Sequence, residues 1–350
     1  MRCRDTSWIV PGKAIREVTL STAGGKACID FAVEHHFCYI LYDAGWYGNE
    51  YDDASDARHV NPDPQRIAHI ANHGGLNLAE VIAYGKARGI GVFLYVNRRA
   101  LERQLDELFP LYEQWGIAGV KFGFVQVGPQ EWTTWIADAV RKAARCHLLV
   151  NIHDNYRPTG LTRTFPNLLT QEGIQGNEHM PNAAHNATFP FTRLPAGAAD
   201  YTICIYDPRL KNSRAHQLAL AVISYSPLQH FYWYDRPSQF RGEPELRFLD
   251  QVPTHWDETR VLDGRIGEFL TLARRSGADW FIGAIAGTQA HPGRINLAFL
   301  PPGRKYTAMI CENGLQQGAT GIRTDIVTAK DTILANLPPA GGLAVWLKAQ

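Results

Sequence analysis

Eight short apolar runs recur along the first two thirds of the chain, and most of them end in polar residues. Several are nearly continuous in apolar residues, which is typical of parallel strands covered on both faces. The runs are SWIV (7–10), CYILYDAGW (38–46), GVFLYVN (91–97), GVKFGFV (119–125), HLLVNIHD (147–154), NLLTQE (167–172), YTICIYD (201–207) and HFYWYD (230–235).

Segments with helical spacing lie between many of these runs. They cover residues 25–36, 77–88, 101–115, 131–145 and 213–224. In the third segment, Leu101, Leu105, Leu108 and Leu111 form one apolar stripe, while Gly89 and Gly116 stand where helices should stop. Strands that alternate with helices predict a (β/α)8 TIM barrel, which we place over residues 1–258.

The pattern changes after WDETRVLDG (256–264). Runs such as EFLTLARR, DWFIGAIAG, YTAMICE and LAVWLKA are rich in strand-forming residues, with Gly and Pro between them and no helical stripe. Residues 259–350 are therefore predicted to form a small antiparallel β-sandwich domain.

The composition excludes several classes of function. Lys and Arg total 35 against 34 Asp and Glu among 350 residues, which gives no electrostatic reason for a nucleic-acid partner. No apolar run is long enough for a membrane span, and the N-terminus shows no secretory signal. The six cysteines form no close CxxC pair, so we expect scattered thiols rather than a zinc site or a disulfide framework.

Polar residues stand near the carboxyl ends of separate predicted strands. They are Asp43, Asn97, Asp154, Glu172, Asp207 and Asp235. A barrel enzyme builds its site at this end of the strands. Any single Asp here could be a solvated loop residue, but the repetition predicts a functional site.

Three carboxylates fall within one short stretch. Asp154 ends one strand, while Glu172 and Glu178 follow the next and are separated by Gly173 and Gly176, which permit a turn. Carboxylates this close raise the pKa of at least one member unless a cation such as Ca²⁺ neutralises them. A carboxylic acid paired with a second carboxylate is what hydrolysis of a glycosidic bond needs.

Other polar and aromatic residues near the strand ends are candidates for substrate binding. Arg157 could contact the substrate or only pack within the RPTG turn. For His153, a structural role is favoured over a catalytic one. Aromatic residues such as Trp46 and Trp233 suit stacking on a sugar ring, although a buried aromatic residue is more often core. No phosphate-binding GxxxxGK loop and no GxSxG motif is present.

The chain resembles glycoside hydrolase family 97. The resemblance rests on VNIHDNYRPTGLTRTFPNLLTQEGIQGNE (150–178), PFTRLPAGAADYT (190–202), HQLALAVISYSPLQ (216–229) and WDETRVLDG (256–264). It implies a bacterial, often periplasmic, Ca²⁺-dependent exo-acting α-glycosidase of the α-glucosidase or α-galactosidase type. It also implies a missing N-terminal β-sandwich domain, because this chain begins at the barrel.

By position in these motifs, the resemblance makes Glu178 the general acid and Glu172 a calcium ligand. Asp154 stands where inverting members carry a glutamate that serves as base and metal ligand. Retaining members have a nucleophilic aspartate where this chain has Gly123, and inverting members have a second base where it has Asn97. Asp43 or Asp154 is therefore the expected partner of Glu178.

These observations give two competing hypotheses and a third that is disfavoured. The first is an α-glycosidase whose catalytic residues are Glu178, Asp154 and Asp43. Its Ca²⁺ ligands are Glu172, Glu178 and Asp154. The residues expected around the substrate are Trp46, Asn97, Arg157, His153 and Trp233. The second is a sugar-binding protein without turnover. An aldolase or isomerase is disfavoured because no suitably placed lysine is evident. The expected partner is an oligosaccharide or α-glycoside substrate. Assembly into a homo-oligomer is a further possibility that the sequence does not decide.

Overall fold

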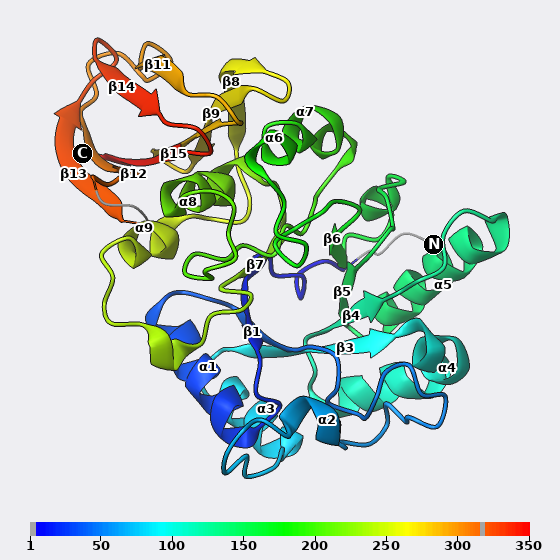
Figure 1. Cartoon of the computed structure of the whole chain (residues 1–350). Coiled ribbons are helices and arrows are strands. Elements are labelled where there is room, and N and C mark those ends of the chain that lie inside the picture. The colour runs from blue at the N-terminus through cyan, green and yellow to red at the C-terminus, as the bar shows by residue number, and fades with distance from the viewer. Residues whose placement is uncertain (1–4, 316–318) are drawn as a thin grey trace. The chain divides into compact units, whose positions relative to one another are not determined.

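The computed structural model describes residues 5–315 and 319–350, and the chain divides into two compact units (Figure 1). The first unit comprises residues up to 174 together with 196–200 and 226–239, and the second comprises 175–195, 201–225 and 240–350. The first antiparallel strand of the second unit begins at Glu258. The division into domains at residue 258 stays a prediction.

The first unit contains a parallel sheet of seven strands that curls into a nearly closed barrel, which confirms the TIM-like fold. In spatial order the strands are β6 (Leu168–Gln171), β5 (Leu149–Ile152), β4 (Gly119–Gly123), β3 (Gly91–Asn97), β2 (Tyr39–Tyr42), β1 (Gly12–Glu17) and β7 (Leu228–Phe231). Nearly every strand residue is buried, as the apolar runs predicted.

Two of the eight expected strand positions differ from the structure. Residues 7–10 precede the first strand, whose sequence GKAIRE is too polar to read as an apolar run. Residues 201–207 form none of the described strands, because Thr202 has a left-handed φ of 57° that interrupts the extended backbone.

The helices of the first unit pack on the strands of the barrel (Figure 1). The helices that contact the strands are α1 (Thr22–Glu34), α3 (Leu78–Lys86), α4 (Arg98–Trp115) and α5 (Gln130–Arg145), together with the 3-10 turn η1 (Leu161–Arg163). The short α2 (Pro64–Ile67) and the 3-10 turn η3 (Pro237–Gln239) also belong to this unit. Along α4, Leu101, Leu105 and Leu108 of the predicted stripe are buried and Leu111 is half-buried, and the helix ends at Gly116 with a left-handed φ of 82°.

The second unit contains the predicted antiparallel β-domain and several helices. The six-stranded sheet has the order β13 (Thr320–Val327), β12 (Tyr306–Asn313), β15 (Gly342–Ala349), β10 (Asp279–Ala286), β9 (Phe269–Ser276) and β8 (Glu258–Arg265), and β11 (His291–Asn296) pairs with β14 (Thr332–Leu337). The helical segments are α6 (Ala183–Asn186), α7 (Phe189–Thr192), η2 (Leu194–Ala196), α8 (Arg214–Ile223) and α9 (Leu246–Gln251).

Helix α8 packs against β10 and β15 at two glycines. A β-carbon added at Gly342 would lie 2.4 Å from the Cα of His216, and one added at Gly283 would lie 2.6 Å from the carbonyl oxygen of Ala219. Any larger residue at these positions would therefore push the helix away from the sheet.

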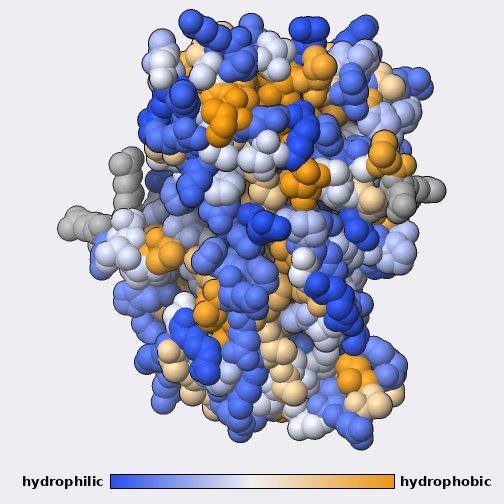
Figure 2. Space-filling model, turned by 90° about the vertical axis from the view of Figure 1, so that its left-hand side faces the viewer, coloured by the Kyte–Doolittle hydropathy of each residue, from blue (hydrophilic) through white to orange (hydrophobic). Residues whose placement is uncertain are grey.

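On the face shown in Figure 2, hydrophobic residues are scattered among hydrophilic ones. No helix in the described residues is long and apolar enough to cross a membrane. Five cysteines lie in the described part and are free thiols, while Cys3 lies outside the described residues.

Candidate active site

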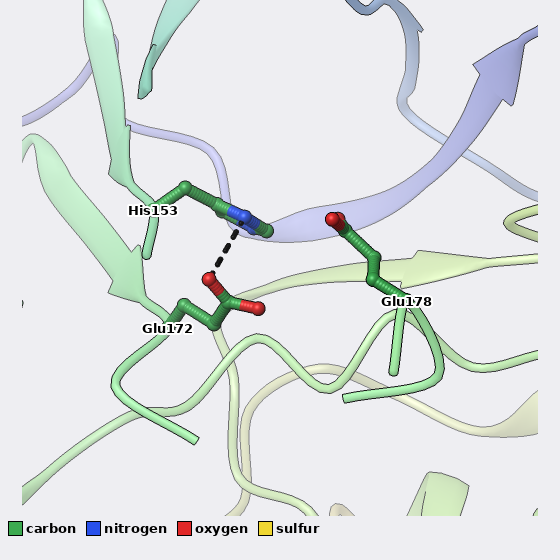
Figure 3. A group of neighbouring side chains, drawn as sticks. All are labelled: His153, Glu172 and Glu178. Atoms are coloured by element: carbon green, nitrogen blue, oxygen red, sulfur yellow. Dashed lines mark ion pairs between the residues drawn. The ribbon is translucent and has the colours of Figure 1, made fainter. Parts of the chain in front are cut away.

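Strands β5 and β6 lie side by side, and three titratable residues follow their carboxyl ends. His153 and Asp154 follow β5, and Glu172 follows β6. The Nδ1 atom of His153 lies 3.2 Å from Oε2 of Glu172 (Figure 3), and the Asp154 N–H donates to the same oxygen at 2.6 Å. The sequence-predicted residues His153, Asp154 and Glu172 therefore meet around one carboxylate.

Carboxylates flank both nitrogens of the buried His153 ring. Glu172 faces Nδ1, and Oδ2 of Asp200 lies 2.9 Å from Nε2. Burial alone would lower the pKa of His153, but the charge of Glu172 and the hydrogen bonds to both carboxylates raise it to about 10. The imidazole is therefore a cation at neutral pH. Its charge outweighs the effect of burial and lowers the pKa of Glu172.

Asp200 is a fully buried carboxylate to which sequence reasoning assigned no role. Its Oδ2 atom accepts hydrogen bonds from Asn151 at 2.9 Å, from His153 at 2.9 Å and from His230 at 2.8 Å. Its backbone N–H donates to the carbonyl of Gln171 at 3.0 Å. Because His230 lies on β7 and Gln171 on β6, Asp200 connects the two edge strands of the nearly closed barrel.

Asp154 is fixed in an unusual conformation. Its φ is 65°, in the left-handed region that aspartate tolerates better than most residues. Its Oδ2 atom accepts a hydrogen bond from the backbone N–H of Phe124, which follows β4. Burial raises the pKa of Asp154 despite this hydrogen bond and the nearby His153. The carboxylate is thus held over the ends of β4 and β5 with an increased affinity for a proton.

Asp43 follows β2 and is buried between two cations. Its Oδ2 atom lies 3.0 Å from Nζ of Lys121 and 3.5 Å from Nε of Arg16, and the Ala44 N–H donates to Oδ1 at 2.7 Å. Burial would raise the pKa of Asp43, but the charges of Lys121 and Arg16 outweigh it and hold the pKa well below its ordinary value. Asp43 is therefore ionised at neutral pH.

Trp233 connects this ion pair to the residues at the ends of β5 and β6. Nζ of Lys121 lies 4.2 Å from the centroid of the Trp233 ring, and the Arg16 guanidinium lies 4.7 Å from it. The His153 ring is nearly parallel to the indole, with centroids 6.3 Å apart. Trp233 is only 1% exposed, and it stabilises both cations through its π face.

Lys121 is a lysine inside the barrel that sequence reasoning did not single out. It lies on β4 and is buried. Its short ion pair with Asp43 favours the ammonium form over the neutral amine that Schiff-base chemistry requires. The signal in the sequence was a single lysine inside the apolar run GVKFGFV.

Three further residues expected at the substrate have other surroundings. Trp46 is fully buried, packs against Tyr47 and donates from Nε1 to the carbonyl of Tyr95 at 2.7 Å. Asn97 is fully buried and caps α4, because its Oδ1 accepts from the Arg99 N–H at 3.0 Å. Arg157 is exposed in the loop after β5. Trp46 and Asn97 thus have structural surroundings.

One group of titratable side chains in the described residues could hold a metal ion. It consists of His153, Glu172 and Glu178, the last of which lies in the loop after β6 (Figure 3). Because both nitrogens of His153 face carboxylates, oxygen atoms are the donors suited to a cation here. Oxygen donors are those that Ca²⁺ prefers.

The fold and the site together define a class of protein. A parallel barrel with several carboxylates at the carboxyl ends of its strands is an architecture of glycoside hydrolases. Residues 11–174 match the family glycoside hydrolase 97, and residues 255–348 match its C-terminal region, which is described as an oligomerisation region. The chain belongs to glycoside hydrolase family 97, as its sequence motifs predicted.

Named relatives and solved structures agree with this membership. A "probable retaining alpha-galactosidase" of Streptomyces bingchenggensis is 34% identical over 310 residues, covering 85% of this chain and 47% of that protein. A "retaining alpha-galactosidase" of Bacteroides thetaiotaomicron is 29% identical, covering 99% of this chain and 55% of that protein. The chain thus spans about half the length of these curated relatives.

A family 97 enzyme from Pseudoalteromonas sp. strain K8 has a similar structure. Its complexes with panose and with acarbose both superpose with a TM-score of 0.88 at 27% identity, covering 99% of this chain and 62% of that one. A β-arabinopyranosidase shares the fold with a TM-score of 0.77 at 21% identity over 96% of this chain and 56% of that chain.

Proposed function

We propose that this chain is the catalytic barrel and C-terminal domain of an exo-acting α-glycosidase of the α-galactosidase type. The observation that carries the proposal is the convergence of His153, Asp154 and Glu172 at the ends of β5 and β6 in a member of this family. The names of the two curated relatives support α-linked galactosides as substrates.

In the proposed mechanism Glu178 donates a proton to the leaving oxygen. Asp154 serves as the second carboxylate, either as the nucleophile that attacks the sugar, with retention, or as the base that takes a proton from the attacking water, with inversion. The names of the two relatives favour retention. The raised pKa of Asp154 favours the base, because such a carboxylate accepts a proton more readily. Asp43 is the alternative partner. Since Lys121 and Arg16 keep it ionised, its favoured role is to accept hydrogen bonds from the sugar hydroxyls.

We also propose Ca²⁺ as the cofactor. Asp154, Glu172 and Glu178 supply the oxygen donors that such an ion requires, while His153 orients Glu172. A bound Ca²⁺ would supply positive charge that stabilises negative charge on the substrate and on water. Loss of the ion should leave these carboxylates repelling each other.

Hydrolysis of nitrophenyl α-galactoside and α-glucoside, with and without EDTA, tests the function. We expect release of nitrophenol from the α-galactoside, loss of that activity in EDTA and its return with added Ca²⁺. Turnover that EDTA leaves unchanged would contradict the Ca²⁺ requirement but not the enzymatic activity. No turnover on either glycoside would contradict the enzyme.

A sugar-binding protein without turnover is the second candidate, because β3 and β4 end in Asn97 and Gly123 rather than in carboxylates. Measurable galactoside affinity by calorimetry together with no hydrolysis would favour it.

The partners are proposed as an oligosaccharide and a second copy of the chain. Panose and acarbose bind the Pseudoalteromonas enzyme, and the C-terminal match is to an oligomerisation region. The molar mass measured by light scattering should therefore be two or more times the 39.1 kDa of a single chain.

A further inference from the structure

Two aromatic rings at the mouth of the barrel are exposed. Tyr51, in the loop after β2, is 50% exposed, and Phe124, directly after β4, is 44% exposed. Their ring centroids are 5.5 Å apart with an interplanar angle of 68°. The rings form one edge-to-face pair although 73 positions separate them in the sequence (124 − 51). A pair from two loops is a more defined surface than a single exposed side chain.

This aromatic pair is linked directly to Asp154. The backbone N–H of Phe124 donates to the Asp154 carboxylate. The Tyr51 ring contacts the Phe124 ring, so Tyr51 is joined to Asp154 through Phe124. The pair therefore lies beside the carboxylate to which the proposed function assigns chemistry.

The conformation of Phe124 is costly for an aromatic residue. Its φ is 55°, in the left-handed region that bulky side chains rarely occupy. Backbone of this kind persists where the surrounding structure holds it, and such positions cluster at ligand sites. Here the strained backbone donates to Asp154 while the ring remains exposed. A purely structural role would be expected to bury the phenyl ring, and this one is not buried.

We propose that Tyr51 and Phe124 form a subsite for the sugar on the leaving-group side of the scissile bond. The proposal rests on the proposed glycosidase function. The apolar faces of a pyranose ring would pack on the two aromatic rings, while its hydroxyl groups remain in water. The ligand is therefore a neutral pyranose sugar that carries an α-linked galactosyl group, and this sugar is the leaving group. Arg99, whose guanidinium lies 5.8 Å from the centroid of the Tyr51 ring, steadies this side of the subsite.

Two substrates that differ only in their leaving groups test the subsite. α-Galactosyl fluoride has no sugar on the leaving side, whereas the disaccharide melibiose has glucose there. Phe124→Ala and Tyr51→Ala should each lower kcat/KM for melibiose by about 2- to 12-fold, the range expected for one aromatic contact. Both variants should lose less activity on the fluoride than on melibiose, because the fluoride carries no sugar that could pack on the rings and Phe124→Ala keeps the backbone N–H that holds Asp154.

Tyr225→Ala is the matched control, since Tyr225 is a 37% exposed tyrosine on the other unit. It should leave both substrates unaffected. Equal losses on the two substrates, or no loss on melibiose, would overturn the subsite.

If the unmodified protein hydrolyses neither substrate, the proposed function fails and the subsite is judged by binding. Calorimetry should then show that Phe124→Ala weakens the affinity for melibiose and leaves that for galactose unchanged. Equal affinities of the variant and the unmodified protein for melibiose would overturn the subsite.

Discussion

The ring of Tyr95 on β3 occupies the space into which a side chain at Gly123 on β4 would project. A β-carbon added at Gly123 would lie 2.1 Å from Cε2 and 2.2 Å from the hydroxyl oxygen of Tyr95. Tyr95 is buried, and its hydroxyl accepts a hydrogen bond from Asn97 at 3.3 Å. The end of β4 thus provides no carboxylate because an aromatic ring from the neighbouring strand takes its place.

Gly123→Ala should therefore destabilise the protein, by about 1–3 kcal/mol for overpacking alone. In the background of Tyr95→Ala the same exchange should cost much less, because the clashing ring is absent. Urea denaturation of the two single variants and the double variant measures this coupling. Gly321→Ala is the control, since its new β-carbon would meet no atom nearer than 3.6 Å. Additive effects in the cycle would contradict the steric account.

Glu178→Gln should lower hydrolysis of galactosides with poor leaving groups by about 10²- to 10⁴-fold, the usual contribution of general acid catalysis. Substrates with a good leaving group, such as dinitrophenyl α-galactoside, should be affected much less because they need no proton. Rates across a series of leaving groups measure the difference. Near-full activity on every member of the series would remove Glu178 from this role.

The polar residues at the strand ends could be predicted from the sequence, whereas the buried hydrogen bonds and ion pairs of Asp200 and Arg16 could not. Asp154 and Glu172 stand where buried apolar runs stop, and because parallel strands align, their meeting follows from the pattern. Asp200 lies outside any strand and reaches the site through the chain path after β6, which no periodicity encodes. Arg16 was hidden because β1 mixes polar and apolar residues.

Asp200→Ala should disorder the site. Asn151, His153 and His230 would lose their shared acceptor, and His153 would no longer be held against Glu172. Loss of such a supporting partner typically costs about 10- to 100-fold in metal affinity or activity. Ca²⁺ titration calorimetry and kcat for nitrophenyl α-galactoside measure the effect. Asp200→Asn, which can keep one acceptor oxygen, should lie between Asp200→Ala and the unmodified protein.

Asn167→Ala separates this effect from a general loss of stability. Asn167 is also fully buried in the barrel, but it precedes β6 at the opposite end and donates to the carbonyls of Val140 and Leu148. The Asn167→Ala variant should have a lower melting temperature but an unchanged Ca²⁺ affinity and kcat. If both variants lose affinity and activity equally, Asp200 has no special role.

His216 should make the stability of the second unit depend on pH. It is fully buried on α8, where Nδ1 lies 3.0 Å from the carbonyl oxygen of Gly341 and Nε2 lies 3.1 Å from the Asn186 amide nitrogen. Burial lowers the pKa of His216 from 6.5 to about 4. Because the unfolded chain takes up this proton first, the contribution to stability is complete above pH 6.5. It is lost as the pH falls from 6.5 towards 4.

The difference between the two pKa values corresponds to about 3 kcal/mol at most. We therefore expect the free energy of unfolding in urea to fall as the pH decreases through this window, and His216→Gln should show a shallower fall. His255→Gln, at an exposed position, controls for the loss of a surface histidine. If the profiles of the unmodified protein and His216→Gln are parallel, His216 does not cause the acid sensitivity. The neutral imidazole would then contribute only by packing between α8 and the loop that contains Gly341.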